Sequence, residues 1–227
     1  MKTTVIIGGS KGIGFAITKE LLATNKVIVI SRTVPDLEHT NLTHHTCDVL
    51  KDELPEIDCI DGLVYCPGSI NLKPITRLSI EDFKEDFEIN VIGAVKTIKH
   101  YLNAVKKGTN PSIVLFSTVA TKLGMPYHAS IATAKAGVEG LVKSLGAELA
   151  PNVRINAIAP TVTNTDLAAK LLRNEKMIEN IRERHPLKRF LDPTDVAHMA
   201  SFLLGDKTLS MSGQILEVDC GIVSFKL

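Results

Sequence analysis

Short apolar runs alternate with longer amphipathic segments along the chain, and this alternation constrains the fold more than any other feature. The first run, residues 3–7, is rich in β-branched side chains and ends at Gly8 and Gly9, as expected of a buried strand. Residues 13–23 follow with apolar side chains at helical spacing. Chains that alternate strands with helices build parallel sheets covered by helices on both faces. We therefore predict an α/β fold of three layers, with a doubly wound parallel sheet of about seven strands.

The remaining elements follow from the same patterns. Further strands are predicted at residues 27–30, 44–47, 63–66, 112–116, 154–158 and 215–218. Helices are predicted at residues 80–107 and 129–149, with one or two helical turns at 35–41 and two or three helices within 166–204. Only 16 residues separate Asp48 from Tyr65, too few for a full crossover helix, so the helix region around residues 50–60 is shortened. No linker or repeat interrupts the pattern, and residues 1–227 are predicted to form one domain.

Composition excludes several classes of protein. With 26 Lys+Arg against 25 Asp+Glu, the net charge of +1 lacks the basic excess of a nucleic-acid-binding protein. The apolar runs are too short to span a bilayer, and the N-terminus lacks the long apolar region of a signal peptide. The four cysteines form neither a CxxC pair nor a Cys/His cluster, which argues against a metal site or disulfide framework. We expect a cytoplasmic protein with reduced thiols.

A glycine-rich loop, Gly8-Gly9-Ser10-Lys11-Gly12-Ile13-Gly14, joins the first predicted strand to the first helix. Glycines at this point permit a tight turn and let the backbone approach a pyrophosphate, whose charge then lies at the helix N-terminus. The same loop could be a turn without a ligand. Its position in a βαβ unit near the N-terminus favours a dinucleotide site.

The residues after the second strand bear on the choice of dinucleotide. Sites selective for NAD usually place Asp or Glu there to bind the ribose 2′-hydroxyl, whereas Arg accommodates a 2′-phosphate. Here Arg32 occupies this region, Lys11 adds a second cation, and Asp36 comes later than the NAD role requires. Both cations could equally be solvated surface residues. Together they favour NADP over NAD.

Several segments resemble the short-chain dehydrogenase/reductase family, in particular its compact branch that includes ketoacyl reductases. The matching segments are Gly8-x-x-x-Gly12-Ile13-Gly14, Cys47-Asp48-Val49, the Gly68 turn, Asn90, the 160–166 segment and the 212–221 ending. The resemblance covers nearly the whole chain and implies a Rossmann fold that binds NADP. It implies a cofactor site comprising Gly8, Ser10, Lys11, Gly12, Ile13, Gly14, Arg32, Asp48, Val49, Gly68, Asn90, Lys135, Thr163 and Thr165.

The resemblance also implies where the chemistry takes place. Members of the family use a Ser hydroxyl, a Tyr thirteen residues later and a Lys four residues after the Tyr. Alignment through Ala134-Lys135-Ala136-Gly137 puts Lys135 at the lysine position, Thr118 at the hydroxyl position and Ile131 at the tyrosine position. Thr118 can orient a substrate oxygen, and Asn90 matches the active-site asparagine. Ile131 cannot exchange a proton.

Tyr127 is the tyrosine nearest to this position in the sequence. It lies eight residues before Lys135, about 12 Å along a helix axis, so it could not take over the role of a Tyr one turn from the lysine. It could still enter the mouth of the site from the loop after Pro126, or it could be a surface or lid residue beside the pocket. His128 has the same two interpretations, of which a solvated turn residue is the simpler.

Three hypotheses follow. In the first, the protein is an NADP-dependent oxidoreductase acting on a carbonyl or alcohol, with a proton supplied by Tyr127, Thr118, bound water or the substrate. In the second, it binds NADP without turnover and acts as a sensor or through partners. In the third, it uses the same pocket for isomerase or lyase chemistry. We favour the first, because Thr118, Asn90 and Lys135 are all present.

The resemblance also predicts assembly and a lid. The helices ending near Lys107 and spanning 129–149 build the subunit interface in this family, which implies a homodimer or homotetramer. Small residues at Ala132, Ala136, Gly137 and Gly140 would allow close helix approach, or would pack within the subunit. Residues 163–189 lie where the family carries its substrate lid.

Overall fold

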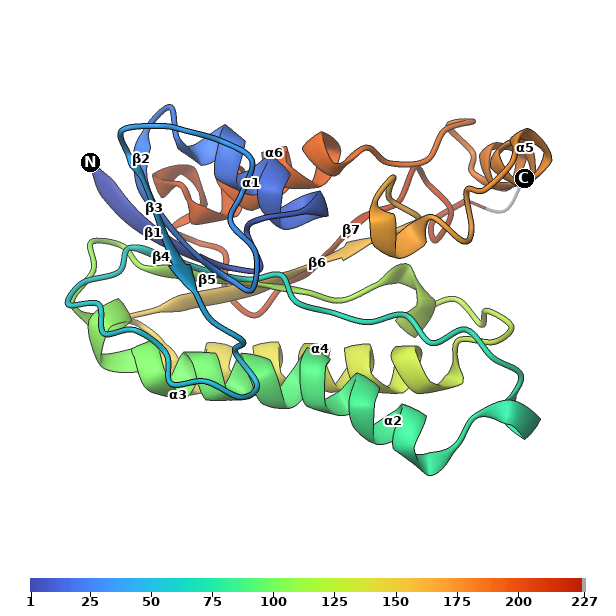
Figure 1. The fold of residues 1–227 in the computed structure, drawn as a ribbon, viewed down its shortest axis with the longest axis horizontal. Coiled ribbons are helices and arrows are strands. Elements are labelled where there is room, and N and C mark those ends of the chain that lie inside the picture. The colour runs from blue at the N-terminus through green and yellow to red at the C-terminus, as the bar shows by residue number, and fades with distance from the viewer. Residues whose placement is uncertain (226–227) are drawn as a thin grey trace.

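Seven strands form one sheet at the centre of the molecule, and every neighbouring pair runs parallel (Figure 1). The computed structural model describes residues 1–225. The strands are β1 (Lys2–Ile7), β2 (Asn25–Ser31), β3 (Leu42–Thr46), β4 (Gly62–Tyr65), β5 (Ser112–Phe116), β6 (Arg154–Pro160) and β7 (Ile215–Val218). Their order is β3-β2-β1-β4-β5-β6-β7, so the predicted doubly wound sheet of about seven strands is confirmed.

Helices cover both faces of the sheet and complete three layers (Figure 1). The α-helices are α1 (Gly12–Leu21), α2 (Ile80–Phe87), α3 (Gly93–Lys106), α4 (Ala129–Leu149), α5 (Glu175–Arg184) and α6 (Pro193–Leu204). Helices α1 and α6 pack together on one face, whereas α2, α3 and α4 lie on the other. Short 3₁₀ turns occur at Ile75–Arg77, Val119–Thr121, Asp166–Ala168 and Asp206–Thr208. Helix α5 stands apart, beyond the carboxyl ends of the strands, and has no buried residue.

Two apolar cores lie between the sheet and its helices, one on each face. Val5 and Ile7 belong to the core beneath α3 and α4, whereas Ile6 belongs to the core beneath α1 and α6. Successive strand residues point to opposite faces, so a strand covered on both sides must be apolar throughout. This explains why the central strands read as unbroken apolar runs rather than as alternating patterns.

Most predicted elements are confirmed, and three of them have the predicted bounds: Ser112–Phe116, Ala129–Leu149 and Ile215–Val218. The helical turns predicted at residues 35–41 are wrong. That segment is irregular, with Leu37 N donating to Pro35 O, and it connects two neighbouring parallel strands. The connection from the end of β2 to the start of β3 must run back along the length of the sheet. A helix rises only about 1.5 Å per residue against about 3.3 Å for extended chain, so an extended segment spans this distance with fewer residues.

The helix predicted at residues 80–107 is continuous, but it contains one wider turn. Residues Glu88–Ile92 form a π-helical turn between α2 and α3, and Asn90 lies inside it. Such turns are frequently found at functional sites. The segment at residues 50–60 has no helix, and Leu54 and Ile60 fill the core there instead. No helix within residues 1–225 has the length and apolar character needed to cross a membrane.

Candidate functional site

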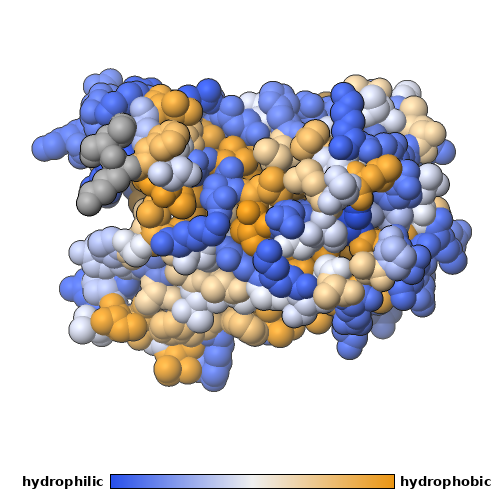
Figure 2. Space-filling view, turned by 180° about the vertical axis from the view of Figure 1, so that it is seen from behind, coloured by the Kyte–Doolittle hydropathy of each residue, from blue (hydrophilic) through white to orange (hydrophobic). Residues whose placement is uncertain are grey.

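The crevice between β1 and β4 lies at the point where the strand order reverses. The chain leaves β1 toward β2 and β3 and returns on the other side of β1 as β4. Gly8 N donates to Ile30 O at 2.8 Å, and Cys66 N donates to Ile7 O at 3.0 Å, so the segments after β1, β2 and β4 meet at one edge. Ligands of open α/β sheets bind in this position. Figure 2 shows this end of the molecule, at its left, hollowed between the part with α5 and the part with α2.

The glycine loop packs backbone against backbone. Gly8 and Gly12 have φ of +76° and +52°, the left-handed region that favours glycine. A Cβ on Gly14 would lie 2.2 Å from Gly8 O. Helix α1 begins at Gly12 with no side-chain cap at Lys11 and no acidic residue in its first turn. Its first N–H groups are therefore open to an anion such as a pyrophosphate.

The residues expected to bind the adenosine part of the cofactor lie beside this loop. Ser10 Oγ and Thr33 Oγ1 are 2.9 Å apart and tie the loop to the segment after β2. Lys11 and Arg32 are both exposed, and within residues 1–225 neither forms an ion pair. Both cations are therefore available to a 2′-phosphate.

Asp48 and Val49 follow β3 at the same edge of the sheet. Cys47 N donates to Ser31 O, which holds this segment against the end of β2. Asp48 Oδ1 accepts a hydrogen bond from Leu50 N at 3.1 Å, and Val49 is buried. The carboxylate keeps acceptor capacity beyond that one bond.

Gly68, Asn90 and Lys135 converge on the other side of the crevice. A Cβ on Gly68 would lie 3.1 Å from Asn90 Oδ1 and 3.6 Å from Lys135 Nζ. Asn90 Nδ2 donates to Asp86 O at 2.7 Å and to Ser69 Oγ at 3.1 Å. Asn90 Oδ1 is buried, and it accepts no hydrogen bond from any residue within 1–225. Such an orphaned acceptor fits a cofactor or water that brings a donor.

Lys135 projects from α4 toward the end of β5. Its Nζ donates to Phe116 O at 2.9 Å. Burial lowers the pKa of Lys135 to about 8, while the nearby Cys66 and Asp86 act to raise it. Thr118 lies two residues beyond Phe116, and its Oγ1 accepts from Ala120 N at 3.3 Å. The hydroxyl proton of Thr118 therefore remains available to donate.

Ile131 lies on α4 one turn before Lys135 and is 4% exposed. Tyr127, by contrast, precedes α4, has φ of +69° and is 59% exposed. Tyr127 O accepts from Lys73 N at 3.3 Å, which fixes the backbone of this loop. Tyr127 and His128 line a cavity of about 500 Å³ together with Lys73, Pro74, Ile75, Ala120, Leu123, Gly124, Met125, Ala129 and Ala132.

Thr163 and Thr165 lie in the segment after β6. Thr163 Oγ1 donates to Thr161 O at 3.0 Å, and a Cβ on Gly12 would lie 3.2 Å from Thr165 Cγ2. The segment thus reaches the glycine loop across the crevice. Thr161, which stands where the family pattern has glycine, forms a 2.7 Å hydrogen bond with the buried His185 Nε2.

A polar cluster beside Asn90 was missed by the sequence-based predictions. Asp86 is fully buried and accepts hydrogen bonds from Ser69, Asn71 and Ser130. The four-residue spacing of Asp82, Asp86 and Asn90 could have indicated one polar helix face. Its partners could not have been identified in this way, because they come from other segments.

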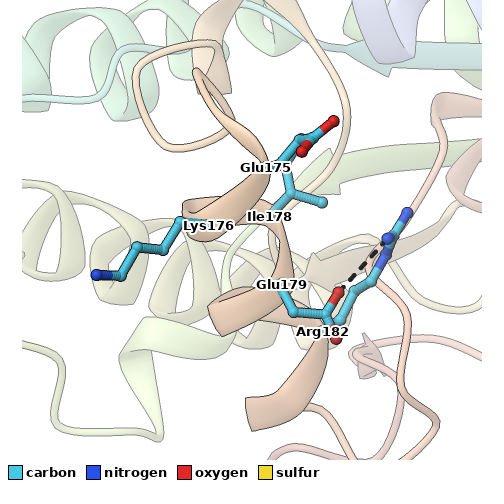
Figure 3. A pocket seen from close by; sticks show the side chains of 5 residues that line it. All are labelled: Glu175, Lys176, Ile178, Glu179 and Arg182. Carbon is cyan, nitrogen blue, oxygen red and sulfur yellow. Dashed lines mark ion pairs between the residues drawn. The ribbon is translucent and has the colours of Figure 1, made fainter.

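A second pocket lies beside α5. Its lining residues, Glu175, Lys176, Ile178, Glu179 and Arg182, all belong to that helix, and Glu179 pairs with Arg182 at 3.7 Å (Figure 3). None of the residues predicted to bind the cofactor lines it, and all of its lining residues belong to the segment 163–189 that is predicted to be the substrate lid.

Comparisons with known proteins identify the family of the chain. Residues 8–223 match the family model described as enoyl-(acyl carrier protein) reductase. The chain is 31% identical to carbonyl reductase family member 4 of Xenopus laevis, over 97% of this chain and 98% of that protein. It is 28% identical to the 3-oxoacyl-[acyl-carrier-protein] reductase FabG of Aquifex aeolicus, over 97% of each chain. The solved structure of ElxO with NADP bound superposes with a TM-score of 0.89 at 27% identity, covering 99% of this chain and 100% of the other.

Proposed function

The chain belongs to the short-chain dehydrogenase/reductase family of NAD(P)-dependent oxidoreductases, and from this premise we propose that it interconverts a carbonyl compound and its alcohol with NADP(H). The observation that carries the proposal is the convergence of Gly68, Asn90 and Lys135 at the carboxyl end of the sheet. Relatives of similar sequence carry the names carbonyl reductase and 3-oxoacyl-[acyl-carrier-protein] reductase, both of which denote the reduction of a carbonyl group.

The residues of this chain fit the cofactor. The pyrophosphate would lie at the open N-terminus of α1, and the preference for NADP rests on Lys11 and Arg32. When bound, the nicotinamide exchanges a hydride with the substrate carbon. The proposed binding residues are Gly8, Ser10, Lys11, Gly12, Ile13, Gly14, Arg32, Asp48, Val49, Gly68, Asn90, Lys135, Thr163 and Thr165.

Thr118 is proposed to orient the substrate oxygen. Its Oγ1 already accepts from Ala120 N, which leaves its own proton to donate to the substrate oxygen. Lys135 is proposed to bind the nicotinamide ribose, as its family position implies. Asn90 shapes the same space through its side-chain oxygen.

The proton donor is atypical in this proposal, because Ile131 aligns with the family tyrosine and is buried. Tyr127 is an unsuitable direct replacement, since it is exposed and precedes the helix that carries Lys135. It is better suited to the mouth of the substrate site. The apolar lining beside it, which includes Ile75, Leu123 and Met125, supports an apolar carbonyl substrate.

The buried Ile131 also favours a second candidate, a protein that binds NADP without turnover. The deciding experiment combines NADPH binding, followed by fluorescence, with NADPH oxidation across a panel of carbonyls. Turnover that Lys135→Met abolishes supports the oxidoreductase. Tight binding without turnover across the panel supports the second candidate, and substrate conversion without net NADPH consumption supports a non-redox reaction.

Homodimer or homotetramer formation also stays a proposal. Gly140 on α4 has nothing within 4 Å of a Cβ, and Phe87 and Ile92, on the segments that pack against α4, are 42% and 40% exposed. Gly137, in contrast, packs within the subunit, where a Cβ would lie 3.3 Å from the Val91 side chain. Residues 163–189 are proposed as the substrate lid, and the cytoplasmic location remains a prediction.

A further inference from the structure

Asp86 is a fully buried carboxylate on α2, one helical turn before Asn90. Its Oδ1 accepts hydrogen bonds from Ser69 Oγ and Asn71 Nδ2, and its Oδ2 accepts one from Ser130 Oγ. These three hydrogen bonds engage both oxygens of the carboxylate. The carboxylate is therefore held in place inside the protein by groups from two other segments, residues 69–71 and Ser130.

Lys135 is the cation that this charge acts on. Burial lowers the pKa of Lys135 to about 8, and Cys66 and, to a smaller extent, Asp86 counteract that effect. On α4 itself, Glu139 lies one turn beyond Lys135, but its Oε1 is engaged by Ser117 and Thr121. A buried ammonium without a counter-charge would lose its proton still more readily.

The space beside Lys135 is suited to a water molecule, which can accept from Lys135 Nζ and donate to Asn90 Oδ1 or to a reacting oxygen. Lys135 Nζ has three N–H bonds, and Phe116 O occupies one of them. Gly68 has no side chain to fill the adjacent volume, and the orphaned Asn90 Oδ1 borders it. Ile131, one turn earlier on α4, offers no proton.

We propose that the Lys135 ammonium is the proton donor of this site, and that Asp86 is a positioning residue that keeps Lys135 charged. This inference rests on the proposed oxidoreductase function. It deepens that function by naming Lys135 on α4 as the source of the proton, and it gives a role to the buried Asp86 and its hydrogen-bond partners.

The step balances in the direction of reduction. The carbonyl carbon receives a hydride, with its electron pair, from the reduced nicotinamide, and the C=O double bond becomes a single bond. The oxygen takes a proton, directly or through one water, as one N–H bond of Lys135 breaks. The neutral amine regains a proton from solvent, and the positive charge that Lys135 gives up would be balanced by that of the oxidised nicotinamide ring.

The first test measures Lys135 in the protein without cofactor. Lysine labelled with ¹³C at Cε allows an NMR titration, and the Lys135 resonance is assigned by its loss in Lys135→Arg. We expect titration near pH 8 in the wild type and at a lower pH in Asp86→Asn. Asp82→Asn is the matched control, since Asp82 lies one turn earlier on the same helix and pairs with Lys73. It should leave the titration unchanged.

The second test follows the reaction. The kcat for reduction should fall as pH rises above about 8, and the fall should begin at lower pH in Asp86→Asn. Arginine in Lys135→Arg stays charged but does not release its proton, so kcat measured at saturating NADPH should fall by about 10²-fold or more. Asp86→Glu should restore the wild-type pH profile.

The outcomes separate the two parts of the proposal from the proposed function. An unchanged Lys135 titration in Asp86→Asn overturns the role of Asp86 alone. The role of Lys135 is overturned if Lys135→Arg has the same kcat as the wild type. It is also overturned if the kcat of the wild type does not change with pH across the Lys135 titration, and this measurement decides even if Asp86→Asn does not fold. Absence of turnover with NADPH bound overturns the proton-donor role together with the proposed function, while the NMR titration still decides whether Asp86 holds Lys135 charged.

Discussion

Gly14 lies so close to Gly8 that a Cβ on the former would be 2.2 Å from the carbonyl oxygen of the latter. Real side chains do not approach backbone atoms this closely, so the loop keeps its course only with glycine at this position. The contact brings the N-terminus of α1 to the end of β1, where a pyrophosphate would bind.

Gly14→Ala should therefore disturb the loop itself. We expect NADPH affinity to fall at least 10-fold and the free energy of unfolding to fall by about 1–3 kcal/mol. Fluorescence titration and urea denaturation measure the two effects. Gly124→Ala is the control, because a Cβ there meets nothing within 4 Å. Equal effects of the two substitutions would contradict the role of the contact.

Arg32→Ala should weaken NADPH binding more than NADH binding. Loss of a charge-assisted contact to the 2′-phosphate is worth about 1.5–3 kcal/mol, so the ratio of the two dissociation constants should change by about 10-fold or more. Lys26→Ala, an exposed cation on β2, is the control and should leave the ratio unchanged. An unchanged ratio in Arg32→Ala would assign that side chain to the solvated surface.

Ile131→Tyr should place a phenol one helical turn from Lys135. A positioned general acid contributes about 10²- to 10⁴-fold, so carbonyl reduction should accelerate by up to that range. Steady-state kcat on the best carbonyl of the panel measures the gain. Ile131→Phe adds the same ring without the hydroxyl and should give no acceleration. Similar rates for the two variants would mean that the hydroxyl does not reach the reacting oxygen.

Lys135 should also make stability depend on pH. Its pKa is lowered from 10.5 to about 8 in the folded protein, so between these values the unfolded chain binds more protons. The free energy of unfolding then rises with pH across this window, by no more than about 3 kcal/mol. Cys66, whose pKa burial raises to about 12 from 9.0, opposes this rise above pH 9.

Urea denaturation of the wild type and Lys135→Met at several pH values measures this contribution. The change between pH 8 and 9 reports Lys135, since Cys66 contributes only above pH 9 and its own pKa is lowered by Lys135. The difference in unfolding free energy between the two proteins should change mainly between pH 8 and 10.5. A constant difference would show that the lysine titrates alike in the folded and unfolded states.

The elements that the sequence predicted best are those set by local pattern. Ala129–Leu149 is a long run at helical spacing, and Ser112–Phe116 is a short apolar run, so each could be recognised from its own residues. The glycine loop belongs to the same class, because its turn depends on residues within seven positions. The π turn at Glu88–Ile92 escaped prediction, since its residues continue the helical pattern on either side.

Residues 35–41 show the opposite case, in which a local pattern was overruled. The helical pattern there is weak, and the segment forms no helix because the chain must span from the end of β2 to the start of β3. Chain length and strand register, both properties of the assembled sheet, determined that segment.

The sequence by itself determined the order of strands and helices, the glycine turn and the absence of a tyrosine at position 131, because each depends on neighbouring residues or on a motif. Only the tertiary structure decided what surrounds Lys135. Asp86 meets Ser130 from 44 residues away and Ser69 from 17 residues away, and Gly68 leaves the space that Asn90 Oδ1 borders. A buried charge is stabilised by whatever groups the fold brings to it, and those groups have no fixed spacing along the chain.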